Sequence, residues 1–380
     1  MSVVQAMPQF VPTTRGAVAA AMRALLLLIV VTTTAQVRAA AGGVTSAVPA
    51  TSDAALVPPM VAFSLRDAGG RSLATPDDAL GDLPALAVLD TGAGTHLLSH
   101  DTALRFGARA DAGARWVETG LSGEHTLAVS TPYTVALDAG TPLLLPAQRL
   151  LLNDVPATAA AVLSNPGAIV DVVGMPALEH AIVELRLDAA LGLPAVLLLP
   201  AGGTVHADRW VPLALVDFNH RRHPDNRGAP PTMAANPVLR GVRVVCGTRD
   251  VRGDWLLDTG SAVTLLSTAG ARALALAEPA PLSAPVGGIS GSEALRGWRV
   301  DRIELPTTTD GVLTVTDAAI FVHDVTTVTD DGTRTTLDGI LGANLLAAFA
   351  RVVIDVPHAR LGFDLPPADD DLRRPRSPRR

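Results

Sequence analysis

Two stretches of apolar residues along the chain stop at the same tripeptide, Asp-Thr-Gly. Residues 85–89 are followed by Asp90, and residues 255–257 are followed by Asp258. Short apolar runs that end at turn-forming residues are typical of buried β-strands. Each run therefore predicts a strand that carries an aspartate to the start of a tight turn, and both turns are followed by Leu-Leu-Ser.

Most of the remaining pattern also favours strands. Apolar and polar residues alternate over 61–65, and short apolar runs predict further strands at 195–199, 242–246 and 352–356. Apolar residues have helical spacing at 177–183 and 344–349, and residues 101–106 could form a short helix. The fold class expected from this pattern is mainly β.

The two Asp-Thr-Gly turns belong to an internal repeat. Asp258 lies 168 positions after Asp90. Two other motifs keep the same offset: Gly-Leu-Ser-Gly at 120–123 matches Gly-Ile-Ser-Gly at 288–291, and Val-Val-Gly174 matches Ile-Leu-Gly342. Three matched pairs at one offset indicate a duplication of about half of the chain.

These motifs resemble those of the aspartic proteases, over roughly residues 57 to 365. The short glycine-rich segments are more similar to those of bacterial retropepsin-like proteins than to the flap of pepsin, because they contain no tyrosine. The resemblance implies a bilobal, pepsin-like acid-protease fold made of two tandem retropepsin-like β-barrel lobes. It also implies a secreted aspartic endopeptidase.

The resemblance assigns roles to individual residues of this chain. Asp90 and Asp258 would form the catalytic dyad, while Gly174 and Gly342 would end the segments that cross behind the two loops. Residues that would brace the loops against each other are Thr91, Gly92, Thr259, Gly260 and Ser261. Residues that would form substrate-binding flaps are Gly120, Leu121, Ser122, Gly123, Gly288, Ile289, Ser290 and Gly291.

Peptide hydrolysis by such a dyad needs two different carboxyl groups. One takes a proton from water, and the other, still protonated, polarises the scissile carbonyl. Two close carboxyls share one proton because both cannot ionise together. Ser261 stands where the first loop has Ala93, so we expect its hydroxyl to donate to Asp258, which would make Asp258 the ionised partner and leave the proton on Asp90.

The amino terminus has the pattern of a secretory signal. Arg15 and Arg23 precede an apolar stretch, and small residues follow near Ala39 and Ala41. Only 14 residues separate Arg23 from Arg38, whereas a membrane-spanning helix needs roughly 20. Export to the periplasm or the medium is expected, without a stable membrane anchor.

The expected organisation has six parts. They are a signal peptide at 1–41, a linker at 42–56, a first lobe at 57–200, an interlobe connection at 201–236, a second lobe at 237–365 and a disordered tail at 366–380. Since both aspartates lie in one chain, we expect a monomer that acts on peptide or protein substrates.

Composition excludes several other classes of function. A net charge of −7 argues against a nucleic-acid-binding protein, and the single cysteine, Cys246, excludes an internal disulfide. His220 and His223 lie beside Asp217 and Asp225, but no zinc-ligand spacing is met, so a solvated loop is expected there. We interpret His96 and His100, near Asp90, as surface or packing residues and expect no metal or cofactor.

Three alternatives remain open from sequence. The main one is a catalytically inactive peptide-binding or scaffold protein of the same fold, although intact Asp-Thr-Gly in both halves argues against it. A second is that each lobe pairs with a lobe of another chain. A serine hydrolase has little support, because neither Ser122 nor Ser290 lies in Gly-x-Ser-x-Gly.

Overall fold

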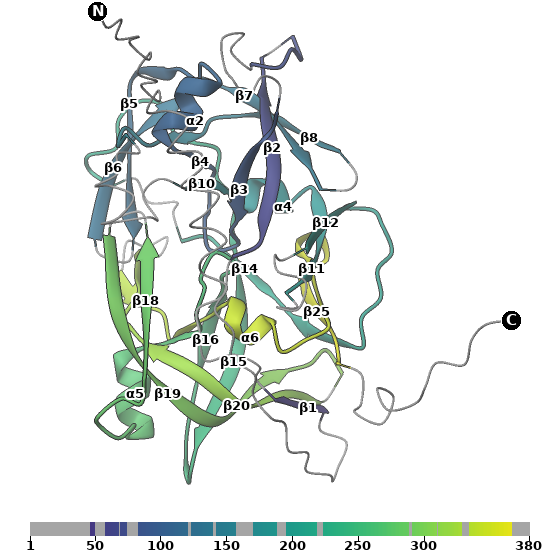
Figure 1. The fold of residues 1–380 in the computed structure, drawn as a ribbon, viewed down its shortest axis with the longest axis vertical. Coiled ribbons are helices and arrows are strands. Elements are labelled where there is room, and N and C mark those ends of the chain that lie inside the picture. Colours follow the sequence, from purple (N-terminus) through teal and green to yellow (C-terminus); the bar gives the residue numbers. More distant parts are fainter. Residues whose placement is uncertain are drawn as a thin grey trace, which may run out of the picture. The chain divides into compact units, whose positions relative to one another are not determined.

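The structure is a computed structural model of the full chain. It describes residues 46–49, 58–67, 69–73, 83–120, 123–139, 142–156, 170–187, 195–218, 223–288, 291–309, 311–328 and 334–366. The described residues form two large sheets, one in each lobe, and a third sheet to which both lobes contribute (Figure 1). The mainly β, bilobal, pepsin-like fold class is thereby confirmed.

The first lobe is built on a nine-stranded sheet. In spatial order its strands are β5 (Ala110–Gly120), β6 (Gly123–Ser130), β9 (Leu151–Leu152), β4 (Leu97–Leu98), β10 (Asp171–Val173), β3 (Ala85–Leu89), β2 (Met60–Arg66), β7 (Tyr133–Asp138) and β8 (Leu143–Gln148). Two short helices accompany it, α2 (His100–Arg105) and α4 (Met175–Leu178).

The second lobe has a sheet with the same core order. Its strands are β1 (Ser46–Pro49), β20 (Val312–Val322), β17 (Leu265–Leu266), β23 (Gly339–Leu341), β16 (Arg249–Leu257), β15 (Asn236–Cys246), β19 (Gly291–Pro306) and β18 (Leu282–Gly288), with β14 (Ala214–Val216) beside β15. The accompanying helices are α5 (Thr268–Leu274) and α6 (Ala343–Leu346), and β21 (Thr326–Val328) pairs with β22 (Arg334–Thr336).

The duplication seen in the sequence is therefore a duplication of strand order. The order β4-β10-β3-β2 in the first lobe is repeated as β17-β23-β16-β15 in the second. In both lobes the strand that leads to the aspartate pairs in parallel with a strand that ends just before Gly174 or Gly342. Leu89 pairs with Val173, and Leu257 pairs with Leu341. Each Asp-Thr-Gly turn is thus held from behind by a crossing strand.

The third sheet joins the lobes. Its order is β12 (Ala195–Pro200), β11 (Ala181–Arg186), β24 (Arg351–Asp355), β25 (Arg360–Asp364) and β13 (Arg209–Pro212), and a 3-10 helix, η3 (Val356–His358), links β24 to β25. Strands β11 and β12, assigned from sequence to the first lobe, therefore share a sheet with the end of the second lobe. Residues paired in register, such as Val183 and Ile354, are both buried, so the lobes share one apolar layer here.

Three further segments differ from the sequence expectations. The expected helix over 177–183 is only the short α4, after which β11 begins at Ala181. The interlobe connection at 201–236 contains β13 and β14. Within the expected linker, β1 pairs in parallel with β20 and buries Val48. Four residues are too few to show a period, so the sequence pattern does not reveal this strand.

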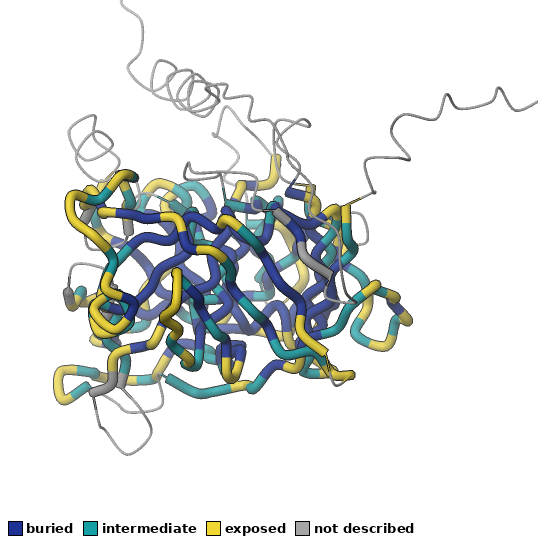
Figure 2. The backbone as a smooth tube through the Cα atoms, turned by 90° about the horizontal axis from the view of Figure 1, so that it is seen from below, coloured by how far each residue is buried: buried dark blue, intermediate teal, exposed yellow. Residues whose placement is uncertain are grey.

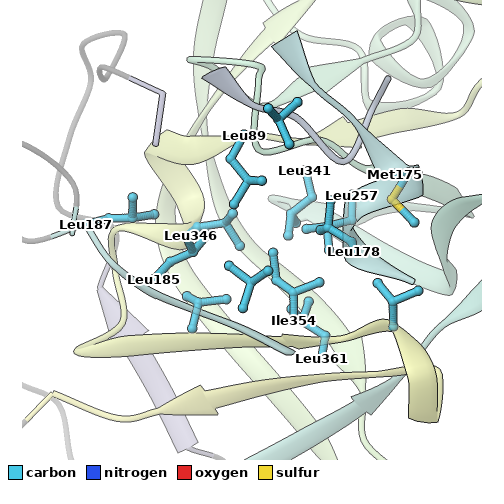
Figure 3. Packing of buried hydrophobic residues seen from close by; sticks show 14 of the residues in the cluster. Leu89, Met175, Leu178, Leu185, Leu187, Leu257, Leu341, Leu346, Ile354 and Leu361 are labelled. Carbon is cyan, nitrogen blue, oxygen red and sulfur yellow. The ribbon is translucent and has the colours of Figure 1, made fainter. Parts of the chain in front are cut away.

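The main hydrophobic core lies beneath the two Asp-Thr-Gly turns. Figure 3 shows Leu89 and Leu257, the residues before the two aspartates, in one cluster with Leu341, Leu346 and residues of the interlobe sheet such as Ile354. These side chains are 0% exposed. Figure 2 shows that buried residues gather in the interior, while exposed residues lie mainly at the periphery. Burial of such side chains contributes about 1.5–3 kcal/mol each, so the turns rest on a well-packed base.

The two lobes fill corresponding core positions differently. In the second lobe Trp255 is paired in register with Gly339, whereas the equivalent pair in the first lobe is Ala87 with Asp171. A Cβ atom at Gly339 would lie 2.5 Å from the Trp255 ring. The large indole thus requires glycine opposite it.

Within the described part of the chain, none of the helices combines the length and the apolarity needed to cross a membrane.

We expect Gly339→Ala to lower the free energy of unfolding by about 1–3 kcal/mol, because the added methyl group overpacks the site against Trp255. Gly202→Ala is the matched control, since a Cβ atom at Gly202 would have no neighbour within 4 Å. Chemical denaturation of both variants measures the difference. Equal stability of the two variants would contradict this account of the core.

Candidate active site

Each aspartate follows the last residue of a central strand and is fixed there by the crossing strand. The backbone N–H of Asp90 donates to Val173 O over 3.0 Å, and that of Asp258 donates to Leu341 O over 3.1 Å. Both aspartate residues are partly accessible, while the threonine that follows each is completely buried. The turns therefore present a carboxyl group to solvent and keep their hydroxyl group inside.

The two loops hold each other through reciprocal hydrogen bonds. Thr91 Oγ1 donates to Leu257 O over 2.6 Å and accepts from the backbone N–H of Thr259 over 3.0 Å. Thr259 Oγ1 donates to Leu89 O over 2.6 Å and accepts from the backbone N–H of Thr91 over 3.1 Å. Four buried bonds thus connect two turns that lie 168 residues apart.

This contact leaves no room for side chains at the glycines of the two turns. A Cβ atom on Gly92 would lie 2.6 Å from Asp258 Cγ, and one on Gly260 would lie 2.4 Å from Asp90 Cγ. Each carboxyl group therefore lies directly over the glycine of the opposite loop. Any other residue at either position would displace the carboxyl group across from it.

The carboxyl groups are close enough to share one hydrogen-bonded proton. Asp90 Oδ1 accepts from the backbone N–H groups of Gly92 and Ala93 over 2.7 and 3.2 Å. Asp258 Oδ1 accepts from the backbone N–H of Ser261 over 2.9 Å. These bonds stabilise the charged form of each carboxyl group and orient both groups.

Burial raises the pKa of both carboxyl groups. The pKa of Asp258 lies well above its ordinary value, and the negative charge of Asp90 raises it further, while hydrogen bonds from Ser261 and Gly260 oppose the shift. Hydrogen bonds from the Asp258 side chain and from Gly92 and Ala93 oppose the shift at Asp90. The two carboxyl groups therefore share one proton.

The sequence expectation about Ser261 is wrong. Its hydroxyl group donates to Val263 O over 2.7 Å, within its own turn, and only its backbone N–H reaches the carboxylate of Asp258. A side-chain hydroxyl satisfies whichever acceptor its rotamer reaches, and here that acceptor is a main-chain carbonyl. Without that bond, the reason for placing the proton on Asp90 no longer holds.

The crossing glycines lie where the sequence places them. A Cβ atom on Gly174 would lie 2.2 Å from Thr95 O, and one on Gly342 would lie 2.2 Å from Val263 O. The residue after each glycine then bonds the loop, since Met175 N–H donates to Ala93 O over 2.9 Å. Ala343 N–H donates to Ser261 O over 2.8 Å in the same way. Only glycine permits this close approach.

Two hairpins stand at the expected flap positions. Strands β5 and β6 end opposite each other at Gly120 and Gly123, and β18 and β19 do so at Gly288 and Gly291. The turn residues Leu121, Ser122, Ile289 and Ser290 lie outside the described residues. Substrate binding by these hairpins stays a prediction.

His96 has a structural position behind the Asp90 loop. Its Nδ1 accepts from the backbone N–H of Gly174 over 3.0 Å, and the residue is buried. The equivalent in the second lobe is Thr264, whose Oγ1 accepts from Gly342 N–H over 3.2 Å. Burial lowers the pKa of His96 to about 4, so the imidazole is neutral, as an Nδ1 acceptor must be. His100 begins helix α2 and is partly buried.

Sequence reasoning missed Asn236, which supports the Asp90 loop from the connection between lobes. Its Nδ2 donates to Thr91 O and to Gly92 O, both over 3.0 Å, and the residue is buried. The 168-residue offset could not reveal it, because the two hairpins before the aspartates differ in length; by strand register the equivalent position is Pro58, which has no side-chain donor. Among the residues that the structure describes, no group of three His, Cys, Asp or Glu is placed to hold a metal ion.

No protein-family model matches the chain, and no curated protein sequence matches it. Solved structures do show similarity. The crystal structure of EDGP aligns with 12% identity and a TM-score of 0.45, covering 82% of this chain and 95% of that one. The aspartic proteinase from Irpex lacteus aligns with 12% identity and a TM-score of 0.43, covering 81% and 96%. Conglutin gamma from lupine seeds aligns with 11% identity and a TM-score of 0.41, covering 81% and 95%. At this level the similarities decide neither family nor activity.

We expect Thr91→Val to destabilise the fold more than Thr91→Ser. Valine has nearly the shape of threonine but leaves Leu257 O and Thr259 N–H without a partner, and each unpaired buried group costs about 1–3 kcal/mol. Serine retains the hydroxyl group and both bonds. Denaturant unfolding of the two variants at one pH tests this, and equal losses would show that the hydroxyl bonds contribute little.

His96 should make stability fall in acid. The unfolded imidazole has a pKa of about 6.5 and the folded one about 4, so between these values only the unfolded chain gains the proton. The free energy of unfolding should therefore fall as the pH drops from 6.5 to 4, by roughly 3 kcal/mol in total. His96→Asn keeps an acceptor for Gly174 N–H but cannot titrate.

The measurement is the difference in unfolding free energy between wild type and His96→Asn across pH 3 to 7. Carboxyl groups with raised pKa values, such as Asp171 at about 6, act in the opposite direction but are common to both proteins and cancel. A difference that does not change with pH would show that His96 is not the titrating group.

Proposed function

We propose that this chain is an aspartic-type endopeptidase that hydrolyses peptide bonds with the Asp90/Asp258 dyad. The observation that carries the proposal is the pair of carboxyl groups held against each other by the reciprocal Thr91 and Thr259 bonds. Burial raises the pKa of both carboxyl groups, and the charge of Asp90 raises that of Asp258, so that the pair holds one proton. A fold does not by itself need this arrangement, since two carboxyl groups held this close destabilise it.

The roles of the two carboxyl groups follow from their environments. Asp90, as the carboxylate, would take a proton from the attacking water. Asp258, as the acid, would donate to the oxygen of the scissile carbonyl while the tetrahedral intermediate forms. As the C–N bond breaks, Asp90 would donate its proton to the leaving amine and Asp258 would take one back from a hydroxyl of the tetrahedral intermediate, which restores the starting form of the dyad.

Several finer features belong to the same proposal. We propose short retropepsin-like hairpins as the substrate-binding flaps, and a peptide or protein substrate. Because both halves of the dyad come from one chain, a monomer would be sufficient. Export to the periplasm or the medium is proposed from the signal pattern at 1–41, a segment that lies outside the described residues. The alternative, an inactive peptide-binding protein, would retain the fold without turnover.

Asp90→Asn and Asp258→Asn should each lower kcat/KM by about 10²- to 10⁴-fold, because each removes one half of the acid–base pair. Asp101→Asn, an exposed residue of α2, is the matched control and should retain activity. The assay is digestion of an unstructured protein at pH 3 to 8, with and without pepstatin. Near-wild-type turnover in either dyad variant would contradict the assignment.

The pH dependence of the same assay tests the assignment of the proton. The rate should fall at low pH as Asp90 becomes protonated and at high pH as Asp258 loses its proton. Since burial raises both pKa values, both limbs should lie at higher pH than for exposed carboxyl groups. An inactive wild type that still binds peptide would instead support the binding protein.

A further inference from the structure

The connection between the lobes touches both the first flap and the Asp90 loop. We call residues 223–236 the interlobe strap. At its first end Arg227 forms two backbone bonds with Arg115 of β5, over 2.9 and 3.0 Å. Asn226 Oδ1 accepts from the backbone N–H of Val117 over 2.7 Å. The strap thus adds to the outer edge of the β5–β6 hairpin.

Close packing supports this end of the strap. Gly228 has a φ of +71°, and a Cβ atom there would lie 2.9 Å from Ala114 of β5. His223 Nε2 also lies 3.5 Å from Glu124 Oε2 of β6. Glycine at 228 therefore permits both the left-handed turn and the contact with the hairpin.

The middle of the strap continues along the first lobe. Thr232 exchanges two bonds with the backbone of Arg149, each over 2.9 Å. Met233 packs against the cluster that contains Trp116 of β5. Ala234 N–H then donates to Gly94 O over 2.9 Å, which brings the strap to the Asp90 loop.

At the second end of the strap, Asn236 donates hydrogen bonds to the carbonyl groups of Thr91 and Gly92. Thr91 O belongs to the same planar peptide unit as Gly92 N–H, and Gly92 O to the same unit as Ala93 N–H. In a trans peptide the carbonyl and the N–H point in opposite directions. By holding both carbonyls, Asn236 aims both N–H groups at Asp90 Oδ1.

Within the described residues, no backbone hydrogen bond of the kind that Arg227 forms with β5 reaches the outer edge of β18, although Phe218 of the connection packs against the cluster that contains Ala284 of β18. Strand β18 is the last strand of its sheet, and its central residue, Pro285, has no backbone N–H to offer a neighbour. Both hairpins are drawn at the left of Figure 1, where β5 and β6 are blue and β18 is green. The two flaps therefore differ in how they are anchored.

We infer that the interlobe strap is a positioning element that couples the first hairpin to the Asp90 loop and leaves the second hairpin the less firmly anchored of the two. Asn226 and Asn236 are its positioning residues. The inference rests on the proposed function for its kinetic consequences, but the coupling itself is a property of the fold. It predicts different consequences at the two ends of the strap.

Hydrogen exchange tests the anchoring without any activity. Amides of β18 should exchange faster than those of β5 in the wild type, because local opening is easier at an unsupported edge. Asn226→Ala should raise exchange in β5 by about 3- to 10-fold, the loss of one hydrogen bond. Asp301→Ala is the matched control, because it removes a bond of the same kind, from Gly247 N–H over 2.8 Å, in another hairpin.

Kinetics tests the coupling to the dyad. Asn226→Ala should raise KM about 3- to 10-fold with kcat within about twofold, because a smaller fraction of the enzyme has the flap in its binding position. Asn236→Ala and the isosteric Asn236→Asp should lower kcat about tenfold or more with little change in KM, since Asp90 is misplaced. They should also move the acid limb of kcat to higher pH, because Asp90 loses oriented donors.

The inference is overturned if β18 is as protected as β5, or if Asn226→Ala changes exchange in β5 no more than Asp301→Ala does. It is also overturned if the folded Asn236 variants leave the acid limb unmoved. Thermal melts establish which variants fold, and the Asn226 comparison does not depend on Asn236. A wild type without proteolysis would defeat the proposed function alone, since the exchange measurements would still decide the anchoring.

Discussion

The reciprocal bonds between Thr91 and Thr259 are the constraint on which the site depends. Each hydroxyl group crosses to the opposite loop and pairs a carbonyl and an N–H that would otherwise be buried without partners. This contact brings the loops so close that only glycine fits at positions 92 and 260. The same closeness makes the two carboxyl groups share a proton. The chemistry proposed for the site therefore follows from the hydrogen bonds that hold the two loops together.

Much of this site could be predicted from the sequence, for a physical reason. Asp90, Asp258, the two threonines and the crossing glycines are needed at fixed places in a tight backbone arrangement, so both copies of the repeat retain them. A residue such as His96 is freer, because any buried acceptor can bond Gly174 N–H, and the second lobe uses Thr264 for the equivalent bond. The duplication therefore preserves backbone geometry more strictly than side-chain identity.

The parts that could not be predicted depend on contacts between distant segments. Strand β11 pairs with β24, about 170 residues later in the chain, and nothing in either apolar run specifies its partner. The helix expected over 177–183 ends early because the interlobe sheet recruits the residues from Ala181. The hydroxyl of Ser261 turns to Val263 O, a choice of rotamer that a residue type does not fix. Asn236 has no counterpart in the repeat.

Two equivalent aspartates that share one proton must differ in their surroundings if one of them is to act as the base. In this chain the hydrogen bonds of the backbone around Asp90 differ from those around Asp258. Asp90 accepts N–H groups of Gly92 and Ala93, whose peptide units are held by Asn236 on their carbonyl sides. Hydrogen bonds in series strengthen one another, so these donors favour negative charge on Asp90. At the position that strand register makes equivalent, the chain has Pro58, which has no side-chain donor. The connection between lobes, which exists once in the chain, is thus well placed to decide which of two nearly equivalent aspartates is the base.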